Sequence, residues 1–422
     1  MSTVGRSPQI GVFAVDDRSA QLTWRNLRPG PLHLRLESVD AVSPSGVYLS
    51  GGDTDPDPDH HDLAAPMPWS ETGPGRFVLD DGAASSPGSV LIAGLPAGRL
   101  VTVHVSGPAV GGERDLALRT LDALPGAELC RIATLSDLHL GTEVFGQRGT
   151  IREHPKPEIP HPQRCTAAAI EEAVHWGAER IVVKGDLTNA GTPTQWREYA
   201  RLVGASPVPV DALPGNHDHA HPKGWTTIAP PEAAASFHLS IANPVLVRDH
   251  PGLRLVLVDT TRAGRHGGSV AGVEADVADA VAGADRDGGV IVALHHQLQP
   301  HLMAEGWPAG IPRDESMRFL ESLGAVHRHV LVTSGHTHRH RRWGHAGVAV
   351  TQVGSTKDYP GVWAGYAVSE GGMRQIVRRV GRTDCLVWTD HSRRAAAGLW
   401  RHIAPGRLDA RCFNVPWTVP VS

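Results

Sequence analysis

The stretch Leu213-Pro214-Gly215-Asn216-His217-Asp218 decides how the rest of the chain is interpreted. A short apolar run ends at a Pro-Gly turn, and an amide, an imidazole and a carboxylate come directly after it. Four other apolar runs end in side chains that can bind a metal ion. These blocks are Asp137-Leu138-His139, Gly185-Asp186, His295-His296 and Gly335-His336-Thr337-His338. Because ligands bind at the carboxyl ends of the strands in an open α/β sheet, the pattern predicts one site built from all five blocks.

In this order, the five blocks resemble the signature of the calcineurin-like metallophosphoesterase superfamily, which runs D-x-H, G-D, G-N-H-D/E, H and G-H-x-H. The resemblance extends from about Ala127 to Val380. Within the superfamily, the segments 136–141, 185–191 and 335–338 are most similar to the cyclic-nucleotide phosphodiesterase (class III) branch. The resemblance implies an α/β fold, a four-layer αββα sandwich of two mixed sheets flanked by helices, with metal ions at one end.

The same resemblance implies a dinuclear metal site in which Asp186 bridges two ions. Carried over block by block, the ligands of one ion are Asp186, Asp137, His139 and His338, and those of the other are Asp186, Asn216, His295 and His336. His336 and His338 are expected to serve neighbouring ions from a turn, which Gly335 makes credible. Imidazole, carboxylate and amide ligands without thiolate leave Fe, Mn, Zn or Co as divalent or mixed-valence candidates.

The resemblance also implies catalytic roles for the last two residues of the block Leu213 to Asp218. His217 is expected to protonate the leaving oxygen, and Asp218 is expected to hydrogen-bond the imidazole and hold its orientation. Three further residues are candidates for substrate contact: His296, His219 and Arg262.

Residues 1–124 differ in pattern from the rest of the chain. Short alternating apolar runs separated by turn-rich segments predict an all-β sandwich. Trp24 and the Gly94-Leu95-Pro96-Ala97-Gly98 segment resemble a fibronectin type III domain, although Leu100 and Val101 stand where that family has a tyrosine. The acidic segment 53–62 lacks the glycine and terminal glutamate of an EF-hand, so we expect a solvated loop.

From residue 125 to residue 380 apolar strands alternate with helical periods, which predicts an α/β layer structure. We expect helices after Thr166 and over 194–203, 273–282 and 313–322. The segment 142–163 holds His154 and His161, and it either lies over the site or is an ordinary surface excursion. Residues 381–422 are expected to form a C-terminal extension whose Trp388, Trp400 and Trp417 pack on the body or on a second subunit, as in a homodimer.

The composition is that of a soluble globular protein, with 41% hydrophobic and 20% charged residues. The net charge of −4 does not provide the excess of positive charge with which proteins bind a long nucleic acid. The sequence shows neither an apolar run of membrane-spanning length nor a secretory signal at its start, so we expect a cytoplasmic protein that does not bind membranes. The four cysteines are far apart, which favours ordinary thiols over a zinc site or a disulfide framework.

These patterns predict a hydrolase that acts on small phosphodiesters, cyclic nucleotides among them, by attack of a bridging hydroxide. A phosphomonoesterase is the alternative, because a β-sandwich before such a domain is similar to the arrangement of purple acid phosphatases. Those enzymes place a tyrosine ligand three residues after the Gly-Asp aspartate, where this chain has Asn189. A nuclease should show a DNA-binding extension and a positive surface, and neither stands out in this sequence. A non-catalytic scaffold tends to lose metal ligands, and this chain retains them all.

Overall fold

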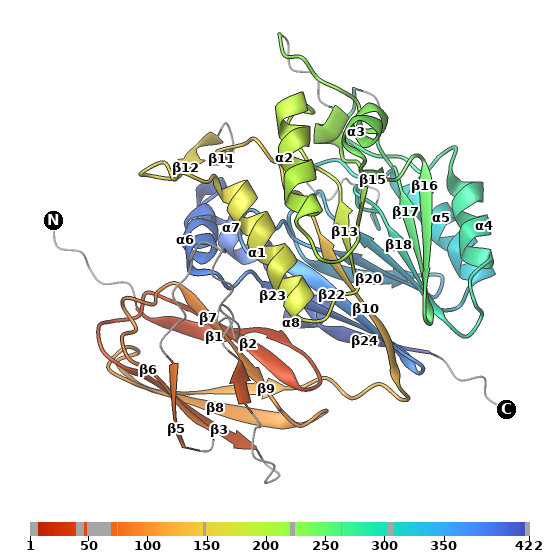
Figure 1. Ribbon diagram of the computed structural model, residues 1–422. Helices are drawn as coiled ribbons and strands as arrows, with labels where there is room; N and C mark the ends of the chain where they lie inside the picture. The colour runs from red at the N-terminus through yellow and green to blue at the C-terminus, as the bar shows by residue number, and fades with distance from the viewer. Residues whose placement is uncertain are drawn as a thin grey trace. The chain divides into compact units, whose positions relative to one another are not determined.

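The computed structural model describes residues 7–38, 46–48, 69–73, 75–146, 149–219, 224–262, 264–301 and 308–417. The acidic segment 53–62 lies outside these residues. The chain divides into two compact units, labelled by element in Figure 1. The first unit holds residues 1–123 and 381–390, and the second holds residues 124–380 and 391–422.

The first unit is built from two antiparallel sheets, as the alternating runs predict. One sheet has the order β1-β2-β7-β4 and the other β5-β6-β3-β8-β9. Their strands are β1 Gln9–Val15, β2 Ser19–Arg25, β3 Leu32–Ser38, β4 Gly46–Tyr48, β5 Trp69–Gly73, β6 Arg76–Leu79, β7 Gly88–Ala93, β8 Leu100–Gly107 and β9 Gly112–Arg119. In β8, Val101, Val103 and Val105 are buried and the residues between them are not. This period of two confirms the all-β prediction, while the fibronectin type III assignment remains a prediction.

The second unit holds a seven-stranded sheet of order β15-β14-β13-β10-β22-β23-β24 and a six-stranded sheet of order β16-β17-β18-β19-β21-β20. The first comprises β10 Glu128–Leu135, β13 Arg180–Lys184, β14 Val210–Leu213, β15 Ser240–Ile241, β22 Val362–Ser369, β23 Gly372–Arg379 and β24 Phe413–Pro416. The second comprises β16 Val245–His250, β17 Leu253–Val258, β18 Gly289–Ala293, β19 Val330–Ser334, β20 Arg341–His345 and β21 Val348–Gln352.

Helices cover the outer face of each sheet, which completes the four layers (Figure 1). Helix α1 (His161–His175) packs on β10 and β22, and it contacts α2 (Pro193–Gly204), which in turn contacts α3 (Pro230–Phe237). On the six-stranded sheet, α4 (Glu274–Ala282) contacts β16 and β17, and α5 (Arg313–Val326) contacts β20 and β21. The predicted αββα sandwich is therefore confirmed.

The direction of the strands brings the five blocks of candidate metal ligands together. β10, β13 and β14 run parallel in one sheet, and β17, β18, β19 and β21 run parallel in the other. The five sequence blocks come directly after β10, β13, β14, β18 and β19, so they all lie at carboxyl edges. A buried ammonium group ties the two sheets together at that edge, because Nζ of Lys184 on β13 donates to Oγ1 of Thr333 (2.9 Å) and to the carbonyl oxygen of Ser334 (3.1 Å) on β19.

The segment after Val380 is divided between the units rather than forming one extension. Its first part, in α6 (Thr383–Ser392), is grouped with the first unit through Asp390, whose carboxylate lies 3.6 Å from Arg25. Beyond it come α7 (Trp400–Ile403), α8 (Leu408–Arg411) and β24, which pairs antiparallel with β23 as an edge strand. In the part of the chain that the structure describes, no helix is both long and apolar enough to cross a membrane.

The apolar core between α4, α5 and the six-stranded sheet supports the strand ends, and Leu323 of α5 lies in it with no exposed surface. We expect Leu323→Ala to lower the free energy of unfolding of the second unit by about 2–5 kcal/mol, because it leaves a cavity in a close-packed core. Val326→Ala, at a position of the same helix that is 42% exposed, should change it by less than about 0.5 kcal/mol. Urea unfolding followed by tryptophan fluorescence measures both, and equal losses would contradict this account of the core.

Candidate metal centre

The backbone at the strand ends adopts a conformation that L residues rarely take. Asp137, His139, Asp186, His336 and His338 have φ angles of 56°, 46°, 49°, 64° and 53°. Each such left-handed residue costs on the order of 1–3 kcal/mol and persists only where surrounding contacts hold it. Strain of this kind clusters at functional sites, and here it falls on predicted ligands.

Hydrogen bonds between blocks hold these turns. The amide of Asp137 donates to the carbonyl of Gly185 (3.1 Å), and the amide of His139 donates to the carbonyl of Asp186 (2.8 Å). Across the two sheets, the amide of His336 donates to Oδ1 of Asp137 (2.9 Å). Each block thus fixes the backbone of another, so the site forms only when all of them are folded.

Three glycines allow the blocks to approach this closely. A Cβ atom at Gly215 would lie 2.3 Å from the amide nitrogen of Asp186, and one at Gly185 would lie 2.4 Å from Nδ1 of His295. A Cβ atom at Gly335 would lie 1.9 Å from Oγ of Ser136. Since such distances are sterically forbidden, only glycine fits at these positions.

The first cluster contains Asp137, His139, Asp186 and His338. Nε2 of His139 lies 3.4 Å from Oδ2 of Asp186 and 3.4 Å from Nε2 of His338. Nε2 of His338 lies 3.4 Å from Oδ1 of Asp137. These atoms converge on one point, since Asp137, His139 and His338 place ligand atoms within 4.8 Å of one another.

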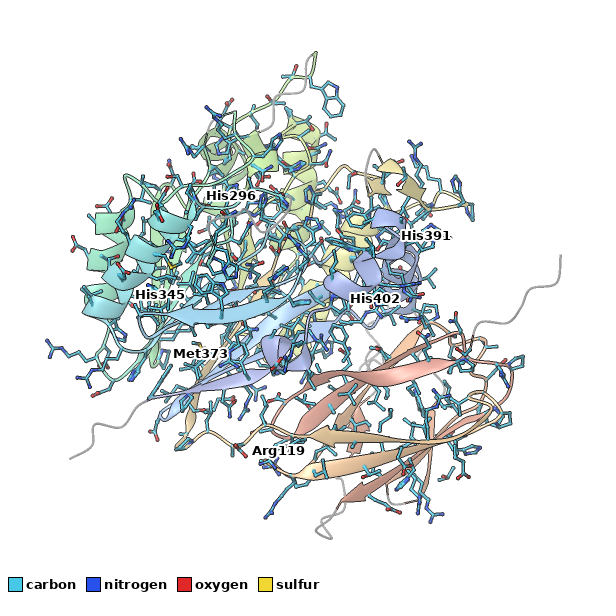
Figure 2. The ribbon with its side chains drawn as sticks, turned by 180° about the vertical axis from the view of Figure 1, so that it is seen from behind. Arg119, His296, His345, Met373, His391 and His402 are labelled. Carbon is cyan, nitrogen blue, oxygen red and sulfur yellow. The ribbon has the colours of Figure 1, made fainter. Side chains whose placement is uncertain are left out.

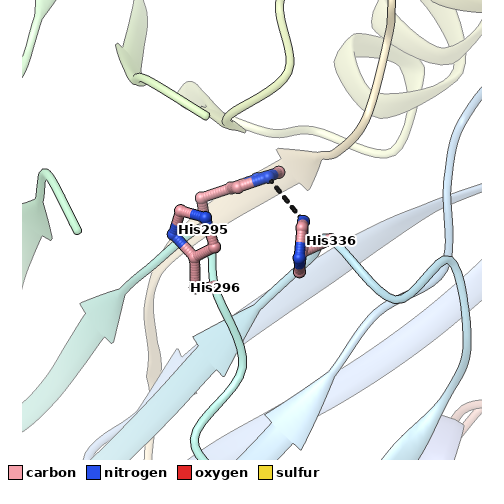
Figure 3. A group of neighbouring side chains, drawn as sticks. All are labelled: His295, His296 and His336. Atoms are coloured by element: carbon pink, nitrogen blue, oxygen red, sulfur yellow. Dashed lines mark hydrogen bonds between the residues drawn. The ribbon is translucent and has the colours of Figure 1, made fainter. Parts of the chain in front are cut away.

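The second cluster contains Asp186, Asn216, His295 and His336. Nε2 of His295 lies 3.3 Å from Oδ1 of Asp186 and 3.3 Å from Oδ1 of Asn216. Nδ1 of His336 lies 3.1 Å from the same Nε2, which is the contact drawn in Figure 3. Asp186 therefore presents Oδ2 to the first cluster and Oδ1 to the second, as a bridging carboxylate would.

The spacing of these atoms fits shared cations. Ligand atoms about 2.1 Å from a common ion lie about 3.0 Å apart at a right angle and about 3.4 Å apart at the tetrahedral angle. The observed separations of 3.1–3.4 Å fall in this range. Two His/Asp clusters that share one carboxylate therefore suit a dinuclear site for divalent ions.

The electrostatics of the clusters also suit cations. Burial would lower the pKa of His295, but Asp186 and Asp137 raise it to about 9. Burial likewise opposes protonation of His338, yet Asp358 and Asp137 raise its pKa to about 10. The carboxylates that attract a proton there would attract a metal ion equally. Burial lowers the pKa of His336 to about 3, so its ring is neutral and offers a lone pair.

Of the two catalytic residues expected from the central block, His217 lies beside the first cluster, with its ring 4.5 Å from that of His139. The expected hydrogen bond from its imidazole to Asp218 was wrong. Nδ1 of His217 instead donates to the carbonyl oxygen of Asn189 (3.0 Å). The physical reason is the 3₁₀ turn Asn216–His219, which sends neighbouring side chains in different directions.

Asp218 has a structural part in the same turn. Its carboxylate accepts hydrogen bonds from the amides of Leu187 (3.1 Å), Thr188 (2.8 Å) and Gly215 (2.8 Å), and from Oγ1 of Thr188 (2.8 Å). These bonds join the block that holds Asp186 to the block that holds Asn216 and His217. Asp218 thus positions the cage and the imidazole through the main chain.

Two residues that the sequence patterns did not single out support the first cluster. Oδ2 of Asp358 accepts from Nδ1 of His338 (2.8 Å) and from Nζ of Lys357 (2.9 Å), and Asp358 is fully buried. A carboxylate on the outer nitrogen of a ligand histidine fixes the ring and raises its basicity. Their position in the sequence could have indicated them, because Lys357-Asp358 follows strand β21 just as each of the other blocks follows a strand.

The segment 142–163 reaches the cage through an aromatic residue rather than through its histidines. The ring of Phe145, in β11 (Val144–Phe145), stacks at 6.2 Å on that of His338. His154 is exposed, and His161 is buried at the start of α1 against Glu153. The segment 142–163 therefore lies over the site at one point, which agrees with the first of the two expectations and not with an ordinary surface excursion.

The three candidates for substrate contact lie in different surroundings. His296 is fully buried, and its Nδ1 lies 2.8 Å from Oγ1 of Thr260. Its ring packs 4.7 Å from that of His336 and 4.8 Å from that of His295, so it supports the ligands from inside (Figures 2 and 3). Nε2 of His219 lies 3.0 Å from Oγ1 of Thr261. Arg262 is exposed and lines a cavity.

We expect Gly215→Ala to lower the metal content of the purified chain from near two ions to below one. The added methyl group would displace Asp186, the shared carboxylate. Gly204→Ala is the control, since nothing lies within 4 Å of a Cβ atom there, and it should keep the parent content. Elemental analysis after dialysis measures both, and full occupancy in Gly215→Ala would refute the close packing described above.

We expect Asp358→Asn to weaken binding of one ion by about 10- to 100-fold, because the ligand His338 loses a charged partner. The matched control is Glu321→Gln, which alters a carboxylate–histidine pair on the surface, where Glu321 lies 3.1 Å from His345. Calorimetric titration with Mn²⁺ resolves the two affinities. Two unchanged affinities would show that Asp358 does not support a ligand.

Comparison with known proteins agrees with this geometry. The pattern of the family described as calcineurin-like phosphoesterase matches residues 130–340, which is half of the chain. No curated protein matches.

Several solved structures are similar to this chain at low sequence identity. A purple acid phosphatase from yellow lupin (Lupinus luteus) seeds is 13% identical, with a TM-score of 0.42, over 89% of this chain and 72% of its own. PhoD is 10% identical, with a TM-score of 0.38, over 87% and 85%. GAP50 of Plasmodium is 13% identical, with a TM-score of 0.40, over 61% and 86%. With its His/Asp clusters at the carboxyl edges of two sheets, the chain belongs to the calcineurin-like phosphoesterase family.

Proposed function

We propose that this chain is a metal-dependent phosphodiesterase that hydrolyses small phosphate diesters, with cyclic nucleotides among the substrates to be tested. The observation that carries the proposal is the shared carboxylate of Asp186 between two clusters, with the imidazole of His217 within 4.8 Å of ligand atoms of His139 and Asp186. Ions bound there, drawn from Fe, Mn, Zn or Co, would supply a water of lowered pKa and would neutralise charge on the phosphate oxygens.

The orientation of His217 supports its role as proton donor. The carbonyl of Asn189 accepts the hydrogen on Nδ1, and the amide of His217 donates to Oδ1 of Asp186 (2.9 Å). Both ends of the residue are therefore fixed relative to the cage, and Nε2 is left to deliver a proton to the leaving oxygen. Asn189 stands where purple acid phosphatases have a tyrosine ligand, and here it contributes a main-chain carbonyl instead.

The charges around the cage favour a diester over a monoester. A diester carries one negative charge, whereas a monoester near neutral pH carries up to two. Two lysines at the cage are committed to internal partners: Lys357 to Asp358 (2.9 Å) and Lys184 to Thr333 (2.9 Å). Neither is placed to balance the second charge.

We expect His217→Ala to lower kcat for bis(p-nitrophenyl) phosphate by about 10²- to 10⁴-fold while the chain retains its metal ions, because proton transfer to the leaving group is lost. His175→Ala, which removes an exposed histidine at the end of α1, is the control and should keep the parent rate. Turnover and metal content are measured on the same preparations. An undiminished rate would reject His217 as the proton donor.

Substrate preference tests the diester proposal separately. We expect kcat/KM with Mn²⁺ to be higher for bis(p-nitrophenyl) phosphate than for p-nitrophenyl phosphate, and a screen should include 3′,5′- and 2′,3′-cyclic nucleotides. A reversed preference would make the chain a phosphomonoesterase. Absence of both metal and turnover would leave a non-catalytic scaffold.

A further inference from the structure

A cavity of about 370 Å³ lies at the end of β17 and is lined by Asp259, Thr261, Arg262 and Ser269 together with small apolar side chains. β17 runs parallel to β18, with Leu257 opposite Ala293. The residues after β17 therefore lie beside those after β18, which include His295. Oγ1 of Thr260 lies 2.8 Å from Nδ1 of His296 and ties the two strand ends together. The cavity thus opens at the same sheet edge as the metal ligands.

A second contact joins the cavity to the proton donor. Oγ1 of Thr261 lies 3.0 Å from Nε2 of His219, which ends the 3₁₀ turn that carries His217. The cavity therefore lies next to the turn that carries the expected proton donor. A ligand group that fills it would belong to the leaving alcohol.

The lining of the cavity is polar, and some of its polar groups can form further hydrogen bonds. Oδ1 of Asp259 accepts from the amide (2.8 Å) and from Oγ1 (2.6 Å) of Thr261, which fixes the carboxylate. Within the described residues, Oδ2 of Asp259 accepts no hydrogen bond, and the guanidinium of Arg262 forms no ion pair. Burial raises the pKa of Asp259, and hydrogen bonds from Thr261 offset part of that rise.

The geometry points to a leaving-group subsite for a small polyhydroxy alcohol, with Asp259 accepting hydrogen bonds from hydroxyl groups and Arg262 donating to hydroxyl oxygens. A carboxylate oxygen can accept from two hydroxyls of a diol, whereas an aliphatic alcohol would leave it unpaired. None of the described residues that line the cavity is aromatic, so they offer no ring on which a nucleobase could stack. This inference rests on the proposed phosphodiesterase activity and names its substrate class: diesters of glycerol or of a sugar.

The test compares two esters that differ only in hydroxyl groups, glyceryl methyl phosphate and propyl methyl phosphate, with the full chain loaded with Mn²⁺. We expect kcat/KM for release of glycerol to exceed that for release of propanol by about 10- to 100-fold, the range for hydrogen bonds to a charged group. Asp259→Asn keeps the shape and the bonds from Thr261, and it should reduce this preference about tenfold. Arg262→Gln, at an exposed position where folding is not at risk, should reduce it also.

Asp276→Asn on the exposed surface of α4 is the control and should keep the preference of the parent chain. Equal kcat/KM values for the two esters in the parent chain, or an undiminished preference in Asp259→Asn, would overturn the subsite.

Failure of the subsite and failure of the proposed function give different results. Turnover of bis(p-nitrophenyl) phosphate without a preference for the glyceryl ester keeps the phosphodiesterase and rejects the subsite. If the Mn²⁺-loaded chain hydrolyses no ester, the proposed function fails, and calorimetry with glycerol 3-phosphate against propyl phosphate still tests the subsite. At least tenfold tighter binding of glycerol 3-phosphate that is lost in Asp259→Asn supports it, and equal affinities reject it.

Discussion

The close approach of two sheets at their carboxyl edges is the constraint on which the rest of this structure depends. Gly185, Gly215 and Gly335 stand where a side chain would collide with another block. Next to two of them, Asp186 and His336 take left-handed conformations that hydrogen bonds from other blocks sustain. The geometry of the cage is therefore set by the backbone before any ion binds.

The cage also depends on buried polar groups that pair with one another. Lys184 lies behind it with its ammonium between Thr333 and Ser334, and Asp358 lies beside it between His338 and Lys357. Burial lowers the pKa of Lys184 to about 7, and Asp137 opposes that shift. Paired polar networks of this kind make a site rigid, because any rearrangement would leave a buried group without its partner. A rigid cage suits a reaction in which charge must be met at fixed positions.

Roles within the central block are divided between side chains and main chain. The amide side chain of Asn216 and the imidazole of His217 face the His/Asp clusters, whereas Asp218 holds the turn from behind by accepting hydrogen bonds from main-chain amides. The carbonyl of Asn189 performs the orienting task that a carboxylate performs in other sites. The loop of Phe145 and the cavity of Asp259 and Arg262 lie at the same edge as the cage, and selectivity among esters would arise there under the proposed function.

The sequence by itself determined the layer order of the fold and the residues of the cage. A single strand-end block such as Gly185-Asp186 is a weak signal, because such a segment is often only a turn, but five blocks in order, each after an apolar run, identified the residues of the cage. Helices such as α2 and α4 were expected within one residue of their bounds, since the helical period of their apolar residues marks them. β20 was missed because this largely exposed edge strand lacks the apolar alternation that marks a strand, and β24 was missed because it has only four residues.

Only the tertiary structure decided which groups meet across the chain. The pairing of Asp358 with His338, the carbonyl of Asn189 on His217 and the cavity at Asp259 are contacts between distant segments or through the main chain, so no spacing in the sequence encodes them. Asp218 shows the limit most clearly: adjacency to His217 suggested a hydrogen bond between them. The direction of each side chain in a 3₁₀ turn depends on the backbone dihedrals, and tertiary hydrogen bonds set those.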